Sequence, residues 1–301
     1  MHPKSVFKVL AAITAYVAAP SYADSMVYKV SSKDNHLYLA GTVHLLKETD
    51  YPLPAEFEAA YRDSTVIGYE IDPDIMASPQ SQAMLMQRMM LPPGEKLSQK
   101  LTPGTYKDFV AVANEQGISA AMLENMNPSA AILIVTVTGL AKLGITPDKG
   151  VEMFYNMKAG SDKKKEFSLE TMSYQLDMIM SLADGQEDAA VRYTIDSIKT
   201  LEKDFQGMVK AWREGDAKGL HKQISGMLKD QYPGMYERLL TKRNKEWLPQ
   251  LEAKLATPEV ETVFVGAGHL VGPDSVLVLL EKAGYTVAPL SLTSTKANAA
   301  K

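Results

Sequence analysis

Two of the five histidines in this 301-residue chain end the same short pattern, near opposite ends of the sequence. In the segments 37–44 and 262–269 an apolar run breaks at a glycine, and a histidine follows three residues later, at His44 and at His269. Such a segment predicts a β-strand leading into a tight turn, with the imidazole at the carboxyl end of the strand. A single Gly-x-x-His is a weak signal, but its repetition favours a shared function. If both strands lie in one parallel sheet, both imidazoles reach the edge where open α/β sheets bind ligands.

Two carboxylates are expected at the same edge of the sheet. Glu70 and Asp72 stand at the end of the apolar segment 65–71. Because alternate residues of a strand face the same way, both carboxylates should point to one side. A buried carboxylate is costly unless a cation, a metal or several hydrogen-bond donors accompany it. Glu70 is therefore either a metal ligand or a structural residue that pairs with an arginine or caps the next helix.

Glu170 is a further candidate for this edge. It ends a short predicted strand that begins at Glu166, and a helix opens directly after it at Thr171. A carboxylate near a helix amino terminus is stabilised by the helix dipole, which is one interpretation of Glu170. The other is a catalytic or ligand role. Gln175, one turn further along that helix, could face the same crevice.

Arg243 and Asn244 lie side by side in a predicted long helix that leads towards the second histidine motif. Arginine offers paired donors in a fixed fork, so the two side chains could clamp a carboxylate or a carbonyl oxygen. In a catalytic site they would position the substrate or stabilise an oxyanion. The alternative is that both residues face solvent on an ordinary helix surface.

Two histidines and a glutamate form a common ligand set of a catalytic divalent metal, which leaves positions open for water and substrate. His44, Glu70 and His269 would be the metal ligands here. Because the set contains no sulfur, Mn, Co, Zn and Fe all remain possible. Such a metal lowers the pKa of bound water, and Glu170 could accept the proton as a base or anchor the other groups.

The first residues of the chain predict a secretory signal peptide over residues 1–23. Two lysines precede an apolar stretch over residues 9–19, and a small-x-small ending follows at residues 21–23. The pattern predicts cleavage after Ala23, and the apolar stretch is too short to span a bilayer comfortably. No later run reaches the length of a membrane helix. We therefore expect a periplasmic or secreted mature chain with no integral membrane segment.

Composition excludes several classes of function. The chain contains no cysteine, so disulfides, thiolate nucleophiles and cysteine-ligated zinc are excluded. Removal of the signal peptide takes two lysines from the 32 basic residues, and the 36 acidic residues then leave a net charge near −6. A chain of this sign offers no electrostatic footprint for nucleic acid or an anionic lipid surface. The tail 291–301 is rich in small and polar residues and is expected to be disordered.

Strand patterns occur near both ends of the chain, and helical patterns fill most of the sequence between them. The expected strands are 26–30, 36–40, 65–71, 262–265 and 286–290. If the terminal strands share one sheet, the helical middle is an insertion or cap on the same domain. We therefore predict a single α/β domain over residues 24–290, with a central mixed sheet formed by the N- and C-terminal strands and a large helical insertion or cap.

The same residues carry a resemblance to a known family. Gly41-Thr42-Val43-His44, followed by Glu70-Ile71-Asp72, resembles the amino-terminal signature of the TraB/PrgY/GumN family, to which the Tiki metalloproteases are related. Further similar segments follow in order over nearly the whole mature chain: 91–95, 150–152, 169–170 with Gln175, 243–244 with Trp247, and 265–270. One departure is Glu152, where many relatives have an aspartate after the valine. The glutamate keeps the charge but lengthens the reach.

The resemblance implies a single α/β domain in which the paired Gly-x-x-His motifs and an acidic residue form a metal site. In Tiki proteins that constellation supports metal-dependent cleavage of peptide bonds, and bacterial relatives are implicated in peptide pheromone shutdown or are encoded near polysaccharide genes. The leading hypothesis is therefore a periplasmic metal-dependent hydrolase, peptidase-like, acting on a peptide or another small substrate. The alternative is a non-catalytic protein of the cell envelope that binds or sequesters a peptide, a glycan or a haem-like ligand.

Overall fold

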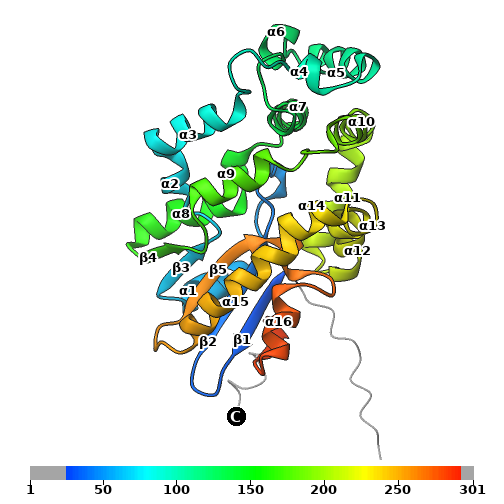
Figure 1. Ribbon diagram of the computed structural model, residues 1–301. Coiled ribbons are helices and arrows are strands. Elements are labelled where there is room, and N and C mark those ends of the chain that lie inside the picture. The colour runs from blue at the N-terminus through cyan, green and yellow to red at the C-terminus, as the bar shows by residue number, and fades with distance from the viewer. Residues whose placement is uncertain (1–24, 293–301) are drawn as a thin grey trace, which may run out of the picture.

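The strands form one mixed sheet of six, which lies towards the lower end of the molecule in Figure 1. The computed structural model describes residues 25–292. The strands are β1 Val27–Ser31, β2 His36–Thr42, β3 Val66–Tyr69, β4 Lys165–Ser168, β5 Glu261–Gly266 and β6 Thr286–Pro289. Their spatial order is β4-β3-β5-β2-β1-β6. The first four in this order are parallel, whereas β1 is antiparallel to both β2 and β6.

The two Gly-x-x-His segments run side by side at the middle of the sheet. Strand β5 pairs directly with β2, and the register places Gly41 beside Val265 and Thr42 beside Gly266. All six residues of β5 are buried. A strand that is buried on both faces of a parallel sheet reads as a continuous apolar run, as the sequence around Phe264 does. The predicted convergence of the two strand ends is therefore confirmed.

Helices occupy most of the chain between the strands. The α-helices are α1 Ala55–Asp63, α2 Pro73–Ala77, α3 Pro79–Met89, α4 Leu97–Lys100, α5 Pro103–Glu115, α6 Ala120–Leu123, α7 Pro128–Lys142, α8 Val151–Asp162, α9 Met172–Met180, α10 Glu187–Ile198, α11 Leu201–Arg213, α12 Ala217–His221, α13 Met227–Gln231, α14 Pro233–Tyr236, α15 Lys242–Leu255 and α16 Val276–Lys282. Three short 3-10 helices are η1 Glu48–Asp50, η2 Pro147–Lys149 and η5 Ala267–Leu270. Two π-helical turns are η3 Lys222–Gly226 and η4 Glu237–Thr241.

The sheet and the helices that cover it share one apolar core. Trp247 and Leu251 of α15 belong to the same buried cluster as the strands, as do Trp212 of α11 and Tyr155 of α8. The Tyr155 ring stacks on Phe264 of β5 with the ring centroids 4.6 Å apart. Large aromatic side chains of this kind contribute much of the apolar area that stabilises a core.

The helical part of the chain forms an extension at one end of the molecule. Helices α4, α5 and α6 lie far from the strands, and α7 and α10 lie between them and the rest (Figure 1). This part has a second apolar cluster that includes Phe109, Val135 and Val191. Strand β4 divides the helical sequence into two stretches. The predicted α/β class, mixed sheet and large helical insertion are confirmed.

Strand β3 ends at Tyr69, earlier than the predicted segment 65–71. Asp72 instead caps the amino terminus of α2, where its side chain accepts a hydrogen bond from Asp74 N. The expected alternation of Glu70 and Asp72 on one side of a strand is therefore wrong. A carboxylate at the N-cap of a helix satisfies a free backbone N–H, which explains why the chain turns here.

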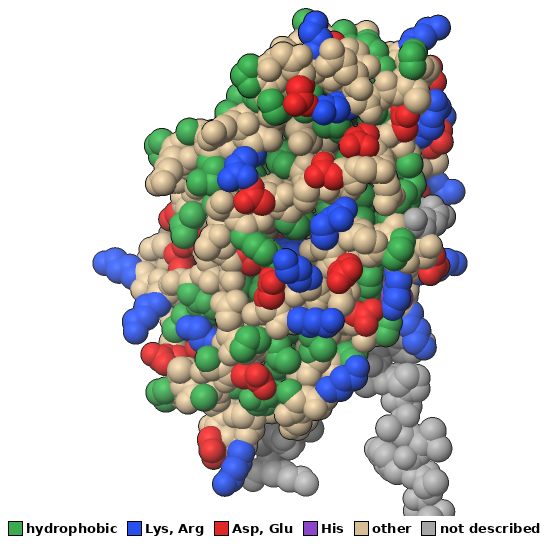
Figure 2. Space-filling view, in the orientation of Figure 1, with side chains coloured by type: hydrophobic (Ala, Val, Ile, Leu, Met, Phe, Trp, Pro, Cys, Tyr) green, Lys and Arg blue, Asp and Glu red, His purple; other side chains and the backbone are tan. Residues whose placement is uncertain are grey.

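The predicted signal peptide over 1–23 and most of the predicted tail lie outside the described residues. Within 25–292 no helix is both long and apolar enough to cross a membrane. On the face shown in Figure 2, Lys and Arg side chains are interspersed with Asp and Glu side chains. That mixture agrees with the balanced, slightly acidic composition.

Candidate functional site

Four candidate residues lie just beyond the carboxyl ends of the four parallel strands. His44 follows β2, Glu70 follows β3, Glu170 follows β4, and His269 lies in η5 directly after β5. Because neighbouring parallel strands end at one edge, residues far apart in the sequence meet there. This edge is the candidate functional site.

Gly266 gives His44 and Glu70 the space to approach each other. A side-chain carbon built on Gly266 would lie 3.0 Å from His44 Nε2 and 3.3 Å from Glu70 Oε1. The Gly266 N–H itself donates to Glu70 Oε1 over 2.7 Å. The glycine of the second motif thus permits a close approach that a larger residue would obstruct.

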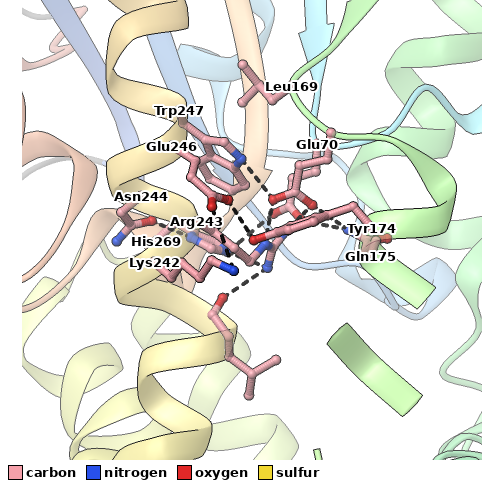
Figure 3. A network of polar contacts seen from close by, with 12 residues as sticks. Glu70, Leu169, Tyr174, Gln175, Lys242, Arg243, Asn244, Glu246, Trp247 and His269 are labelled. Atoms are coloured by element: carbon pink, nitrogen blue, oxygen red, sulfur yellow. Dashed lines mark hydrogen bonds and ion pairs between the residues drawn. The ribbon is translucent and has the colours of Figure 1, made fainter. Parts of the chain in front are cut away.

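Arg243 lies at the centre of the polar cluster (Figure 3). Its Nη2 donates to Glu70 Oε2 and, over 3.0 Å, to Glu170 Oε2. Its Nε donates to Glu170 Oε1 over 2.6 Å. The Arg243 side chain is only 5% exposed, and those of Glu70 and Glu170 are 10% and 4% exposed. Arg243 therefore faces the site as a clamp on two carboxylates, and the alternative of a solvent-facing helix surface is excluded.

Glu170 is held by donors on both carboxylate oxygens. Besides Arg243, the indole Nε1 of Trp247 donates to Oε1 over 2.9 Å. Gln175 Nε2 lies 3.4 Å from Oε2 and 3.2 Å from Glu70 Oε2, so it bridges the two carboxylates (Figure 3). The expectation that Gln175 faces the crevice is confirmed. The N-cap of α9 is Thr171, so Glu170 serves the cluster rather than the helix end.

Asn244 holds the second histidine in one tautomer. Its Nδ2 donates to the Asp274 carbonyl over 2.8 Å, which turns its Oδ1 towards His269 Nδ1 at 2.6 Å. His269 therefore carries its proton on Nδ1 and presents the lone pair of Nε2. Arg243 Nη1 donates to that Nε2 over 3.0 Å, and Glu70 Oε1 lies 3.7 Å from it.

His44 is oriented by a residue to which the sequence assigned no role. Glu152 Oε1 accepts from His44 Nδ1 over 2.7 Å and also from the Thr42 hydroxyl. The Nε2 of His44 is thereby turned towards Gly266 and Glu70. Glu152 sits in the first turn of α8, and the Val151 N–H at the start of that helix donates to the Val43 carbonyl. The sequence feature that could have indicated this role is Gly150-Val151-Glu152, one of the segments that resemble the family.

Comparison with known proteins places the chain in a family. A family model described as the TraB/PrgY/gumN family matches residues 26–289. The chain belongs to the TraB/PrgY/gumN family. The "Uncharacterized protein YbaP" of Escherichia coli (strain K12) is 22% identical over 247 residues, which cover 82% of this chain and 88% of that protein. The protein of the same name from Shigella flexneri is similar to the same extent. No solved structure gives a significant match.

The charged groups at the site of this TraB/PrgY/gumN family protein shift one another's pKa values. Burial raises the pKa of Glu70, but Arg243 and the two histidines outweigh it and lower the value to about 2. Burial raises the pKa of Glu170 above its ordinary value despite the Arg243 contacts. Burial also lowers the pKa of His269 to about 3. In contrast, the Glu152 carboxylate raises the pKa of His44 to about 9.

Two observations bear on whether these residues could hold a metal ion. Both histidines have Nδ1 fixed by an oxygen acceptor and Nε2 turned into the site, which is how ligating histidines are usually oriented. The chemistry of the donor set therefore fits a divalent cation. Among residues 25–292, however, no three His, Asp or Glu side chains already surround one position. Arg243 has to release His269 Nε2 before that nitrogen can ligate.

Proposed function

We propose that this TraB/PrgY/gumN family protein is a metal-dependent hydrolase, peptidase-like, with its centre at the carboxyl ends of the four parallel strands. The observation that carries the proposal is the matched orientation of His44 and His269 around Glu70. Each imidazole has its Nδ1 proton engaged, by Glu152 in one case and by Asn244 in the other. Each Nε2 is then turned to the side of Glu70, where His44 would ligate after losing a proton and His269 after its release by Arg243.

The charge balance of the site supports a divalent ion. Two carboxylates, those of Glu70 and Glu170, share one permanent cation, Arg243, while the Glu152 carboxylate contacts His44. Buried carboxylates in excess are costly and require further cations or protons. A divalent cation such as Mn, Co, Zn or Fe(II), held by His44, Glu70 and His269, would supply that charge and would activate a water molecule for attack.

The surrounding residues have positioning roles in this proposal. Glu152 and Asn244 fix the histidine tautomers, and Glu170 fixes Arg243. Every guanidinium nitrogen of Arg243 already donates, including Nη1 to the Leu239 carbonyl. Direct contact of Arg243 with a substrate or an oxyanion therefore requires the release of one of these bonds. A fixed surrounding shell of this kind keeps ligand geometry within narrow limits.

The test combines metal binding with turnover. The protein is purified from the periplasmic fraction, where we expect its amino terminus at Asp24 because the signal peptide pattern ends at Ala23. Manganese, cobalt and zinc affinities are measured by calorimetry for wild type, His44→Ala and His269→Ala, with circular dichroism as a check on folding. We expect each substitution to weaken binding at least 10-fold, and a peptide library to be cleaved only with metal.

The control is His36→Ala. His36 contacts Asp63 at the opposite end of β2, so its removal should leave metal affinity unchanged. Equal and low metal content in wild type and both site variants would refute the ligand assignment. Saturable binding of a peptide, glycan or haem in the presence of chelator, without product by mass spectrometry, would favour the non-catalytic alternative.

A further inference from the structure

A second concave region lies in the helical part of the molecule. It is a cavity of about 660 Å³ enclosed by α7, α10 and α11, by the end of α9, and by the segment from η3 to α14. These elements lie together beside the extension of the molecule (Figure 1). The volume is in the range of small-molecule binding pockets. The cavity is distinct from the polar cluster, because none of its lining residues belongs to that cluster as described above.

The lining of this cavity is mostly hydrocarbon. Ile132 and Leu133 of α7, Ile179 at the end of α9, and Met208 of α11 contribute to it. Leu133 remains 37% exposed, and Tyr193, which also lines the cavity, is 40% exposed. Large apolar side chains that stay accessible around a concavity are typical of a binding site for an apolar ligand. The apolar side chains that line the cavity thus leave open space between them.

Only two side chains of the described lining are charged, Asp204 and Lys222, and they differ in the partners that they contact. Asp204 accepts a hydrogen bond from the Thr200 hydroxyl over 2.6 Å. Lys222 is exposed at the edge of the cavity, and no ion pair to it occurs within the described part of the chain. An ammonium group beside an apolar cavity complements an anionic head on a hydrocarbon tail.

We propose that this cavity binds a single-chain amphiphile of the fatty-acid type. The hydrocarbon chain lies against the apolar walls of α7 and α10, and the carboxylate pairs with Lys222. A single hydrocarbon chain with one charged end matches a lining that is mostly apolar and includes the Lys222 ammonium group. The apolar walls give affinity in proportion to chain length, and the ammonium group selects the charged head.

The proposed ligand lies close to the polar cluster without belonging to it. Gln175 and Ile179 are one turn apart on the same face of α9. Gln175 contacts the polar cluster, and Ile179 lines the cavity. Ile224, another lining residue, lies 3.2 Å from the position of a side-chain carbon on Gly268. The proposal does not depend on hydrolysis at the sheet edge.

Binding is tested with dodecanoate on the full mature protein by calorimetry, below the concentration at which dodecanoate forms micelles. We expect one saturable site, and octanoate should bind about 10-fold or more weakly because it loses four methylene groups. Thr136→Trp, which fills the cavity from α7, should weaken dodecanoate binding at least 10-fold. The matched control is Met157→Trp on α8, where the side chain is 60% exposed and outside the lining.

The head-group assignment has its own test. Lys222→Gln should weaken dodecanoate binding several-fold and leave dodecan-1-ol binding unchanged. No saturable binding to wild type, or wild-type affinity in a folded Thr136→Trp variant, would overturn the proposal. If Thr136→Trp does not fold by circular dichroism, the partly exposed Leu133→Glu variant replaces it, and unchanged affinity there has the same meaning. Equal losses for the acid and the alcohol in Lys222→Gln would reject the anionic head.

Discussion

At the scale of single residues, Arg243 determines the electrostatics of the sheet edge. Its guanidinium forms ion pairs with two buried carboxylates, those of Glu70 and Glu170. The guanidinium carbon Cζ also lies 4.9 Å from the centroid of the Trp247 ring. A buried ion pair stabilises the fold little more than apolar residues of similar volume would. Removal of one partner, however, leaves an uncompensated buried charge and is strongly destabilising. The negative charges of Glu70 and Glu170 are therefore both compensated by the single side chain of Arg243.

Substitution of this arginine should be costly. We expect Arg243→Met to lower the free energy of unfolding by about 3–5 kcal/mol, since both glutamates lose their buried cation. Arg243→Lys should fall between this variant and wild type, because an ammonium group cannot reproduce the forked geometry. Urea unfolding at neutral pH measures both.

The control for this prediction is a surface arginine. Arg62, whose side chain is 77% exposed, pairs with Glu58 along α1, and Arg62→Ala should change stability by less than about 1 kcal/mol. A loss as small as this in Arg243→Met would show that another cation compensates the two glutamates.

At the scale of elements, the site depends on the direct pairing of β2 with β5. The pairing places Thr42 beside Gly266, so the two strands end side by side and the turns that follow them begin at neighbouring positions. The π-helical turn η4 immediately precedes Arg243 in the same helical stretch. Such π turns often occur at functional sites, because they change the direction in which the next side chains point.

The pairing predicts a specific effect of Gly266→Ala. The backbone of Gly266, with φ −51° and ψ 133°, is accessible to alanine, so only the new methyl group matters. That methyl group would lie 3.0 Å from His44 Nε2, and the half-exposed imidazole should swing outwards. We expect metal affinity to fall at least 10-fold in calorimetry, with a loss in unfolding free energy of at most about 1–2 kcal/mol.

Gly104→Ala serves as the matched control. The added carbon at Gly104, in the first turn of α5, would lie 3.8 Å from Arg192, which is an ordinary contact. Its metal affinity should equal that of wild type. Wild-type metal affinity in Gly266→Ala would mean that His44 and Glu70 do not share a ligand.

At the scale of the whole molecule, the protein combines a sheet that packs into one apolar core with a helical extension that has its own apolar cluster. Glu70, Glu170 and Arg243 at the edge are buried by helices from distant parts of the sequence, among them α9 and α15. Their pKa shifts are therefore a property of the folded state, and they disappear when the chain unfolds.

The stability of the metal-free protein should depend on pH in both directions. The pKa of His269 is lowered to about 3, so the unfolded chain binds the extra proton and stability is lost as the pH falls below about 6.5. The lowered pKa of Glu70 adds a second loss below about pH 4.5. The raised pKa of His44 acts oppositely, and its contribution is lost as the pH rises towards about 9.

Urea unfolding in chelator over this pH range tests the prediction. One proton changes the slope by at most about 1.4 kcal/mol per pH unit. His269→Gln should flatten the acid side between pH 6.5 and 4.5, and Glu152→Gln should flatten the alkaline side between pH 6.5 and 9. Unchanged slopes in both variants would show that other groups carry the dependence.

The sequence by itself determined the class of the fold and most members of the cluster. The alternation of apolar runs with glycine breaks predicts the strands around Gly41 and Gly266, because strand patterning and turn chemistry are local properties. A histidine or glutamate that directly follows such a strand is then placed at the edge of the sheet. For this reason His44, Glu70, Glu170 and His269 could be named together.

Only the tertiary structure decided what these residues contact. Whether Arg243 faces solvent or a pair of carboxylates depends on how α15 rotates against the sheet, and the roles of Glu152 and Asn244 depend on which atoms lie within hydrogen-bond reach. The cavity between the helices also has no signature in the sequence. Contacts between segments far apart along the chain are set by packing of the whole core, which local patterns do not encode.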